Sequence, residues 1–126
     1  MAFFAWLTSL LAGQRISDTT SGFQAIGGKP GIQDDKGRLI YMHNGGLFLV
    51  TAPIDGQPAT AGNGCTIGFA MENPEQANAW HAAGVEAGGT SIEDPPGVRE
   101  GGFGQLYLAY LRDPSGNKLC ALHRVA

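Results

Sequence analysis

A chain of 126 residues with 43% hydrophobic residues is long enough to bury one core and to form about one domain. Its net charge of −3 is small and its eight lysines and arginines are scattered, which argues against a nucleic-acid-binding protein with a basic face. The 20 glycines and 7 prolines favour short strands joined by many turns over a helical bundle.

The first thirteen residues are strongly apolar, and their pattern favours a helix over a signal peptide or a membrane anchor. They have no positively charged start and no small-residue cleavage site, and they are too short to span a bilayer. Their large apolar side chains recur at the spacing of one helix face that ends at Gly13: Phe3, Phe4, Leu7, Leu10 and Leu11.

The two cysteines form neither a disulfide framework nor a Cys-x-x-Cys motif. We therefore expect a cytoplasmic protein that does not associate with membranes.

The rest of the first half has the pattern of short strands separated by turns. Strands are predicted at residues 14–17, 23–26, 38–43 and 47–52. Asn44-Gly45-Gly46 is the strongest hairpin signal among these turns, and it predicts that the third strand folds back on the fourth. Residues 53–64 are rich in Pro, Gly, Ala and Thr without a helix or strand period, so they predict a connector between two halves.

The second half begins with a predicted strand at residues 65–71, and a helix follows it. Asn73, Pro74 and Glu75 supply an N-cap, a first-turn proline and a first-turn acid, so the helix is expected to start there. Its predicted buried stripe consists of Ala77, Trp80, Ala83 and Val85. The helix should end at Gly88-Gly89, where glycine accepts the left-handed conformation.

Further strands and a glycine-rich loop complete the second half. A short strand is predicted at 90–92, the loop at 93–104, and two longer strands at 106–112 and 118–123. Between the longer strands lies Asp113-Pro114-Ser115-Gly116, where proline sets φ and glycine accepts a positive φ, so a hairpin is predicted.

The glycine-rich loop has two interpretations. It is either a mobile flap, with Phe103 as an apolar lid and Arg99 as an anion anchor, or a plain hairpin connector. It lacks the Lys-Ser/Thr ending of a phosphate-binding loop and does not open a helix, so a phosphate cradle is disfavoured.

Three segments resemble the vicinal oxygen chelate superfamily, which includes the glyoxalase, bleomycin-resistance and dioxygenase proteins. They are the closing hairpin at residues 110–123, the helix end Ala87-Gly88-Gly89-Thr90, and Ala2-Phe3-Phe4-Ala5-Trp6-Leu7, which is similar to the family's Ala-Phe-Tyr-Asp-x-Leu. The resemblance implies one α+β domain over residues 1–126. In it, two strand-helix-strand modules, at about 1–60 and about 61–126, would form a cupped mixed sheet.

The same resemblance implies a departure at the start of the chain. Members of the superfamily carry a strand before the first helix, whereas this sequence opens inside that helix. The first module would then lack its first strand and leave an open sheet edge. Three explanations stay open: a rearranged strand order, a partner chain that covers the edge, and a reading frame that begins too late. We favour a homodimer, because paired modules of this superfamily often share their cups between chains.

The resemblance also indicates which residues stand where metal-dependent members hold their ion. These are Leu49 in place of a carboxylate, Thr66 beside an expected histidine, and Cys120 in place of the last glutamate. A divalent cation needs several nitrogen, oxygen or sulfur donors at about 2 Å, which one thiol and one hydroxyl do not supply. We therefore expect no metal and no other cofactor.

The function that the resemblance implies is metal-independent binding of a small, partly apolar molecule in the cup, as in the sequestering resistance proteins. The candidate ligand-binding residues are Phe48, Thr66, Arg99, Phe103, Tyr107 and Cys120. Two alternatives stay open. One is a glyoxalase-like lyase or dioxygenase-like enzyme with atypical ligands, and the other is a protein that only dimerises.

Candidate catalytic side chains are few. Strand alternation places Cys120 on the inner face of the cup, where a cysteine is either a small buried hydrophobe or, beside a cation, a reactive thiolate. His123 should face the opposite side, His81 should lie at the edge of the helix stripe, and His43 should be a solvated strand end. No Ser-His-Asp or Cys-His spacing is evident, so no catalytic residue is assigned.

Overall fold

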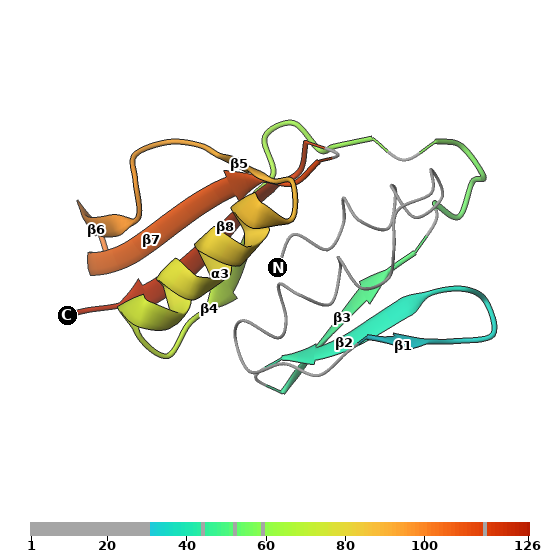
Figure 1. Ribbon diagram of the computed structural model, residues 1–126, viewed down its shortest axis with the longest axis horizontal. Coiled ribbons are helices and arrows are strands. Elements are labelled where there is room, and N and C mark those ends of the chain that lie inside the picture. The colour runs from blue at the N-terminus through green and yellow to red at the C-terminus, as the bar shows by residue number, and fades with distance from the viewer. Residues whose placement is uncertain (1–30, 44, 52, 59, 115) are drawn as a thin grey trace.

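The computed structural model describes residues 31–126 except 44, 52, 59 and 115. The helix predicted over the first thirteen residues and the strands predicted at 14–17 and 23–26 lie outside the described residues. In the described part, the strands of a first sheet precede those of a second sheet along the chain, and one helix follows the first strand of the second sheet. Figure 1 shows the two sheets side by side.

The first sheet is antiparallel, with the order β1-β2-β3, and consists of β1 (Ile32–Gln33), β2 (Leu39–His43) and β3 (Gly46–Val50). His43 pairs with Gly46 and Leu39 pairs with Val50, which confirms the hairpin predicted at the Asn-Gly-Gly turn. Gly45 has a φ of 76°, a conformation that such turns need and that glycine adopts without strain.

The second sheet consists of β4 (Ile67–Ala70), β5 (Thr90–Ser91), β6 (Gly97–Gly101), β7 (Gly104–Arg112) and β8 (Lys118–Arg124). Its order is β4-β8-β7-β5, and β6 also pairs with β7. The β4–β8 pair is parallel and the other pairs are antiparallel. The predicted closing hairpin is confirmed, with Arg112 opposite Lys118. The α+β fold class is therefore confirmed.

The turn of the closing hairpin depends on a buried carboxylate. Asp113 is 4% exposed, and its two oxygens accept hydrogen bonds from the backbone N–H and the side-chain amide of Asn117, at 2.8 and 2.9 Å. Gly116 donates its backbone N–H to the Asp113 carbonyl at 2.9 Å and has a φ of 92°. An aspartate at the first position of such a turn satisfies the backbone groups that the tight reversal leaves unpaired.

The loop predicted at residues 93–104 is wrong in part, because five of its residues form β6. Gly97 to Gly101 pair antiparallel with β7, so that the connector is a hairpin whose tip is Gly102 and Phe103. A strand that begins and ends with glycine has little β-propensity of its own. The neighbouring strand β7 supplies its hydrogen-bonding partners, which is a tertiary effect that no local pattern reveals.

The helix α3 (Pro74–Glu86) begins where the sequence predicts. The Asn73 side chain accepts a hydrogen bond from the Gln76 N–H at 2.8 Å, and Pro74 occupies the first turn. The helix ends before Gly88, whose φ is 103°, as predicted. Its buried residues are Ala77, Trp80 and Gly84. The prediction of Val85 in the buried stripe is wrong, because that side chain is 41% exposed and the neighbouring glycine takes the place against the sheet.

Packing of α3 against the second sheet makes most of the core. The helix contacts β7, β8 and β5 and lies along one face of the sheet (Figure 1). The fully buried residues are Ala77 and Trp80 of the helix, Ala109 and Leu111 of β7, and Leu119 and Ala121 of β8. Because side chains alternate along a strand, the intervening residues of β7 and β8 point to the other side of the sheet.

Replacement of Gly84 by alanine should destabilise the protein. A Cβ at this position would lie 2.4 Å from Cδ2 of Leu111, which is fully buried and has little room to move. Alanine ordinarily stabilises a helix by about 1 kcal/mol relative to glycine. Overpacking costs about 1–3 kcal/mol and should outweigh that gain. We expect a lower free energy of unfolding for Gly84→Ala, measured by urea denaturation.

The control for this experiment is Ala79→Gly, which alters helix propensity on the exposed side of α3. A Gly84→Ala protein that is more stable than the parent would contradict the close packing of the helix on β7.

Candidate functional site

The second sheet has one covered face and one open face. Tyr107, Ala109 and Leu111 of β7 point toward α3, and the Tyr107 hydroxyl donates a hydrogen bond to Asn78 Oδ1 at 2.7 Å. The alternate residues point away from the helix, and the cross-strand pairs Leu108–Leu122 and Tyr110–Cys120 place them together. We call this side the open face. Its residues are Leu106, Leu108, Tyr110, Arg112, Lys118, Cys120 and Leu122, with Gly68 and Ala70 of β4.

The open face is mainly apolar and incompletely covered. Leu106, Leu108, Tyr110 and Leu122 are half-buried, and Ala70 is exposed. The first sheet also presents apolar side chains on the side opposite its buried residues. There, Ile32, Met42 and Leu47 are exposed, and Ile40 and Leu49 are half-buried. Apolar surface of this extent, rimmed by polar groups, is typical of a ligand or partner site.

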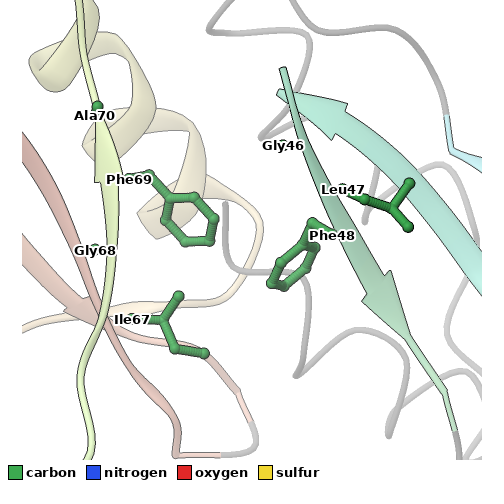
Figure 2. Close-up of a pocket in the computed structure, with 7 residues that line it drawn as sticks. All are labelled: Gly46, Leu47, Phe48, Ile67, Gly68, Phe69 and Ala70. Carbon is green, nitrogen blue, oxygen red and sulfur yellow. The ribbon is translucent and has the colours of Figure 1, made fainter. Parts of the chain in front are cut away.

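The two sheets meet along β3 and β4. The rings of Phe48 and Phe69 contact each other with their centroids 5.5 Å apart and their planes at 74°. Figure 2 shows these two rings pointing toward one another from facing strands, with Ile67 beside them and Leu47 directed away. A groove of about 310 Å³ runs between the strands and is lined by Gly46, Leu47, Phe48, Ile67, Gly68, Phe69 and Ala70. Edge-to-face aromatic contact of this kind holds the strands in place.

A group of polar side chains lies at one end of the open face. The Lys118 ammonium lies 4.8 Å from the centroid of the Tyr110 ring, a cation–π contact, and forms an ion pair with Glu93 from the loop between β5 and β6. Glu93 has a φ of 58°, the left-handed conformation that non-glycine residues rarely adopt. Strained backbone of this kind is concentrated at binding and catalytic sites.

Cys120 lies inside this group as a neutral thiol. The residue is 4% exposed, and its Sγ donates a hydrogen bond to the Ala121 carbonyl at 3.4 Å. Burial raises the pKa of the Cys120 thiol, and the Glu93 carboxylate acts in the same direction. Tyr110 and Lys118 oppose the shift without cancelling it. Burial also raises the pKa of the Tyr110 phenol. Of the two roles open for Cys120, the structure supports the buried hydrophobe rather than the reactive thiolate.

The six residues predicted for ligand binding do not form one cluster. Cys120 is on the open face and Phe48 is in the groove between the sheets. Thr66 is exposed and precedes β4, whereas Phe103 is 84% exposed at the tip of the β6–β7 hairpin. Tyr107 is on the face covered by α3. Their participation in binding stays a prediction.

Arg99 stabilises a loop. Its guanidinium donates hydrogen bonds to the backbone carbonyls of Asp94 and Pro95, at 2.9 and 2.8 Å. These contacts connect β6 to the loop segment that directly follows Glu93. Tyr110, Lys118 and Glu93 are not among the six residues predicted to bind a ligand. Strand alternation places Tyr110 and Lys118 on the same face as Cys120. Only the tertiary structure shows that Glu93, in the loop between β5 and β6, reaches Lys118.

His81 and His123 lie outside this group. His81 is half-buried at the edge of the helix stripe, as expected, and its Nε2 is 3.0 Å from the Ser91 hydroxyl. Burial lowers the pKa of the His81 imidazole. The Nδ1 of His123 is 3.0 Å from the Met71 carbonyl, on the side away from Cys120.

The described residues do not fit a divalent metal ion. Leu49 has no donor atom, Thr66 offers an exposed hydroxyl, and the Cys120 thiol is 4% exposed and hydrogen-bonded to the Ala121 carbonyl. Within residues 31–126, apart from the four gaps, no three His, Cys, Asp or Glu side chains gather closely enough to hold a metal.

The two cysteines should differ strongly in reactivity. Cys65 is exposed and Cys120 is buried with a raised thiol pKa. At pH 8 we expect iodoacetamide to modify Cys65 within minutes and to leave Cys120 intact until the protein unfolds. Mass spectrometry of the Cys65→Ser variant isolates the second thiol. Rapid alkylation of Cys120 in that folded variant would contradict the assignment of a protonated, buried thiol.

No helix in the described part of the chain has the length and apolar character needed to cross a bilayer.

Comparison with known proteins places this architecture in a family. No protein-family model and no curated protein matches the sequence. Solved structures do match. A glyoxalase/bleomycin resistance protein from Albidiferax ferrireducens T118 is 52% identical with a TM-score of 0.80, over 86% of this chain and 89% of that chain.

Two more distant structures share the fold. A glyoxalase/bleomycin resistance protein/dioxygenase family enzyme from Burkholderia phytofirmans PsJN is 18% identical, with a TM-score of 0.61, over 86% of this chain and 90% of that chain. A hypothetical protein from S. aureus is 18% identical, with a TM-score of 0.65, over 88% of this chain and 87% of that chain. The high identity to the first protein over most of both chains decides the assignment: the chain belongs to the glyoxalase/bleomycin resistance family.

Proposed function

We propose that this protein binds a small, partly apolar molecule on the open face of its second sheet, without a bound metal ion. The observation that carries the proposal is the combination, on one face, of half-buried leucines with the polar group around Lys118. Ligand sites in proteins are mostly apolar and have a few polar groups that fix orientation. Membership of the glyoxalase/bleomycin resistance family supports a small-molecule role.

The donor atoms on the described strands favour binding over metal-assisted catalysis. Leu49 and the protonated thiol of Cys120 stand where the family resemblance expects charged ligands. The buried, neutral thiol adds no charge to this face. Metal analysis of protein purified without chelators tests this point, and about one tightly bound divalent ion per chain would contradict metal-independent binding.

A homodimer is the second candidate, and the first sheet favours it. Ile32 is 68% exposed, and Met42 and Leu47 are each 61% exposed. A second copy of the chain could cover these side chains, since apolar residues of this size are typical of interface cores. A melting temperature that rises with protein concentration would support it. The two functions are compatible if the ligand occupies the second sheet and the partner covers the first.

Substitution of Leu108 should weaken ligand binding. Leu108→Gln places an amide in the middle of the apolar open face, and desolvating it on ligand binding costs free energy. A ligand at 100 times its dissociation constant adds about 2.7 kcal/mol to the stability of the parent protein, and we expect less than half of that for the variant. Thermal-shift titration with small amphiphiles measures the difference.

The matched control is Val98→Gln. Val98 is 50% exposed in β6 and pairs with Tyr107. Its side chain therefore lies on the same side of the sheet as α3, opposite the open face. Equal ligand-induced shifts for the two variants would contradict the placement of the site.

A further inference from the structure

We propose that the open face selects amphiphiles with an apolar body and an anionic head group, and that Lys118 binds this head group in place of Glu93. This inference rests on the proposed function and adds the charge of the ligand to it. It depends on three observations: the setting of Lys118, the backbone conformation of Glu93, and the order of apolar and polar residues along β7 and β8.

The Lys118 ammonium is held where a ligand can reach it. Its side chain is 25% exposed, and its ammonium lies over the Tyr110 ring, a cation–π contact that favours this position. The guanidinium groups nearby are committed to the backbone. Arg99 donates to Asp94 and Pro95, and Arg112 donates to the Gly116 carbonyl at 2.7 Å. Their charges nevertheless add positive potential to this end of the face.

Glu93 is a partner that a ligand can displace. Its carboxylate side chain is 43% exposed, and such a solvated ion pair contributes little net stability because water and salt screen it. Its backbone has a φ of 58°, which costs free energy for a residue with a side chain. The loop contacts of Arg99 hold the segment in this conformation. A carboxylate carried by a ligand can therefore take the position of the Glu93 carboxylate without disturbing a buried structure.

The apolar body of the ligand has a continuous surface to lie on. From the Tyr110–Cys120 pair, the next pair on the same face is Leu108–Leu122, and Leu106 follows. At about 3.3 Å per strand residue, the distance from Tyr110 to Leu106 is roughly 13 Å, which matches a short alkyl chain or one to two rings. The protonated Cys120 carries no charge that would repel an anion beside it.

Octanoate, octan-1-ol and octylamine provide the test, since they share one alkyl chain and differ in head-group charge. Dissociation constants are measured by calorimetric or thermal-shift titration of the full chain, below micelle-forming concentrations. We expect octanoate to bind at least about tenfold more tightly than octan-1-ol, and octylamine to bind most weakly. Increasing salt should weaken octanoate binding and leave octan-1-ol binding unchanged.

Two variants identify the residues. Lys118→Met keeps an unbranched apolar stem, removes the charge and should reduce octanoate affinity to that of octan-1-ol. Glu93→Gln removes the competing charge and should increase octanoate affinity several-fold, a gain that partial unfolding cannot produce. Lys36→Met, at an exposed position before the glycine turn between β1 and β2, is the control for a general loss of positive charge.

The outcomes separate this inference from the proposed function. If octan-1-ol and octanoate bind equally, or if octylamine binds best, the anionic preference is wrong and small-molecule binding stands. If Lys118→Met and Lys36→Met reduce octanoate affinity equally, Lys118 is not the head-group site. If none of the three compounds binds and no other small molecule shifts the melting temperature, the proposed function fails together with the inference.

Discussion

The antiparallel register of β7 against β8 determines which side chains of the second sheet share a face. Tyr110 stands opposite Cys120, and Arg112 stands opposite Lys118. The hydrogen bonds of the buried Asp113 carboxylate to Asn117 close the turn that sets this register. Because side chains alternate with a period of two, a slip of one residue would exchange the two faces. Leucines would then lie under α3 in place of Ala109 and Ala121, where there is no room for them.

The two faces of that sheet therefore differ in how closely their side chains are packed and how far they are exposed. Under the helix, small residues alternate with large ones, and Gly84 allows Leu111 to approach the backbone of α3 closely. Such dense packing supplies stability. On the open face, several leucines keep part of their surface in water, at a cost of about 25 cal/mol for each Å² of apolar area. A bound molecule or a second chain removes that cost, so incomplete burial on one face favours association.

Family membership and local chemistry together limit the function. The 52% identity to a glyoxalase/bleomycin resistance protein establishes the family, whereas neighbours at 18% identity show the fold alone. Within that fold, the described strands carry leucine and a protonated thiol where the family resemblance expects metal ligands. The polar group around Lys118 is a separate feature of this sheet. Its elements are an ammonium, a carboxylate and an aromatic ring, and they support the proposal of ligand binding without a metal ion.

The sequence by itself determined the features that local hydrogen bonding controls. The Asn73 cap, the glycine at the end of α3 and the turns of two hairpins depend on residues within a few positions of each other. Alternation along β8 likewise placed Cys120 and Lys118 on one face. For Tyr107, one of the six predicted ligand-binding residues, alternation alone did not indicate the side toward α3, because the position of the helix decides which face of β7 is covered.

Only the tertiary structure decided the remaining features. The strand β6 exists because β7 pairs with it, and the place of Gly84 in the helix stripe follows from the approach of Leu111. The contact between Glu93 and Lys118 joins residues 25 positions apart. Pairing across such distances depends on the register of whole strands and on loop conformation, so the arrangement of polar and apolar groups on the open face is a property of the assembled sheet.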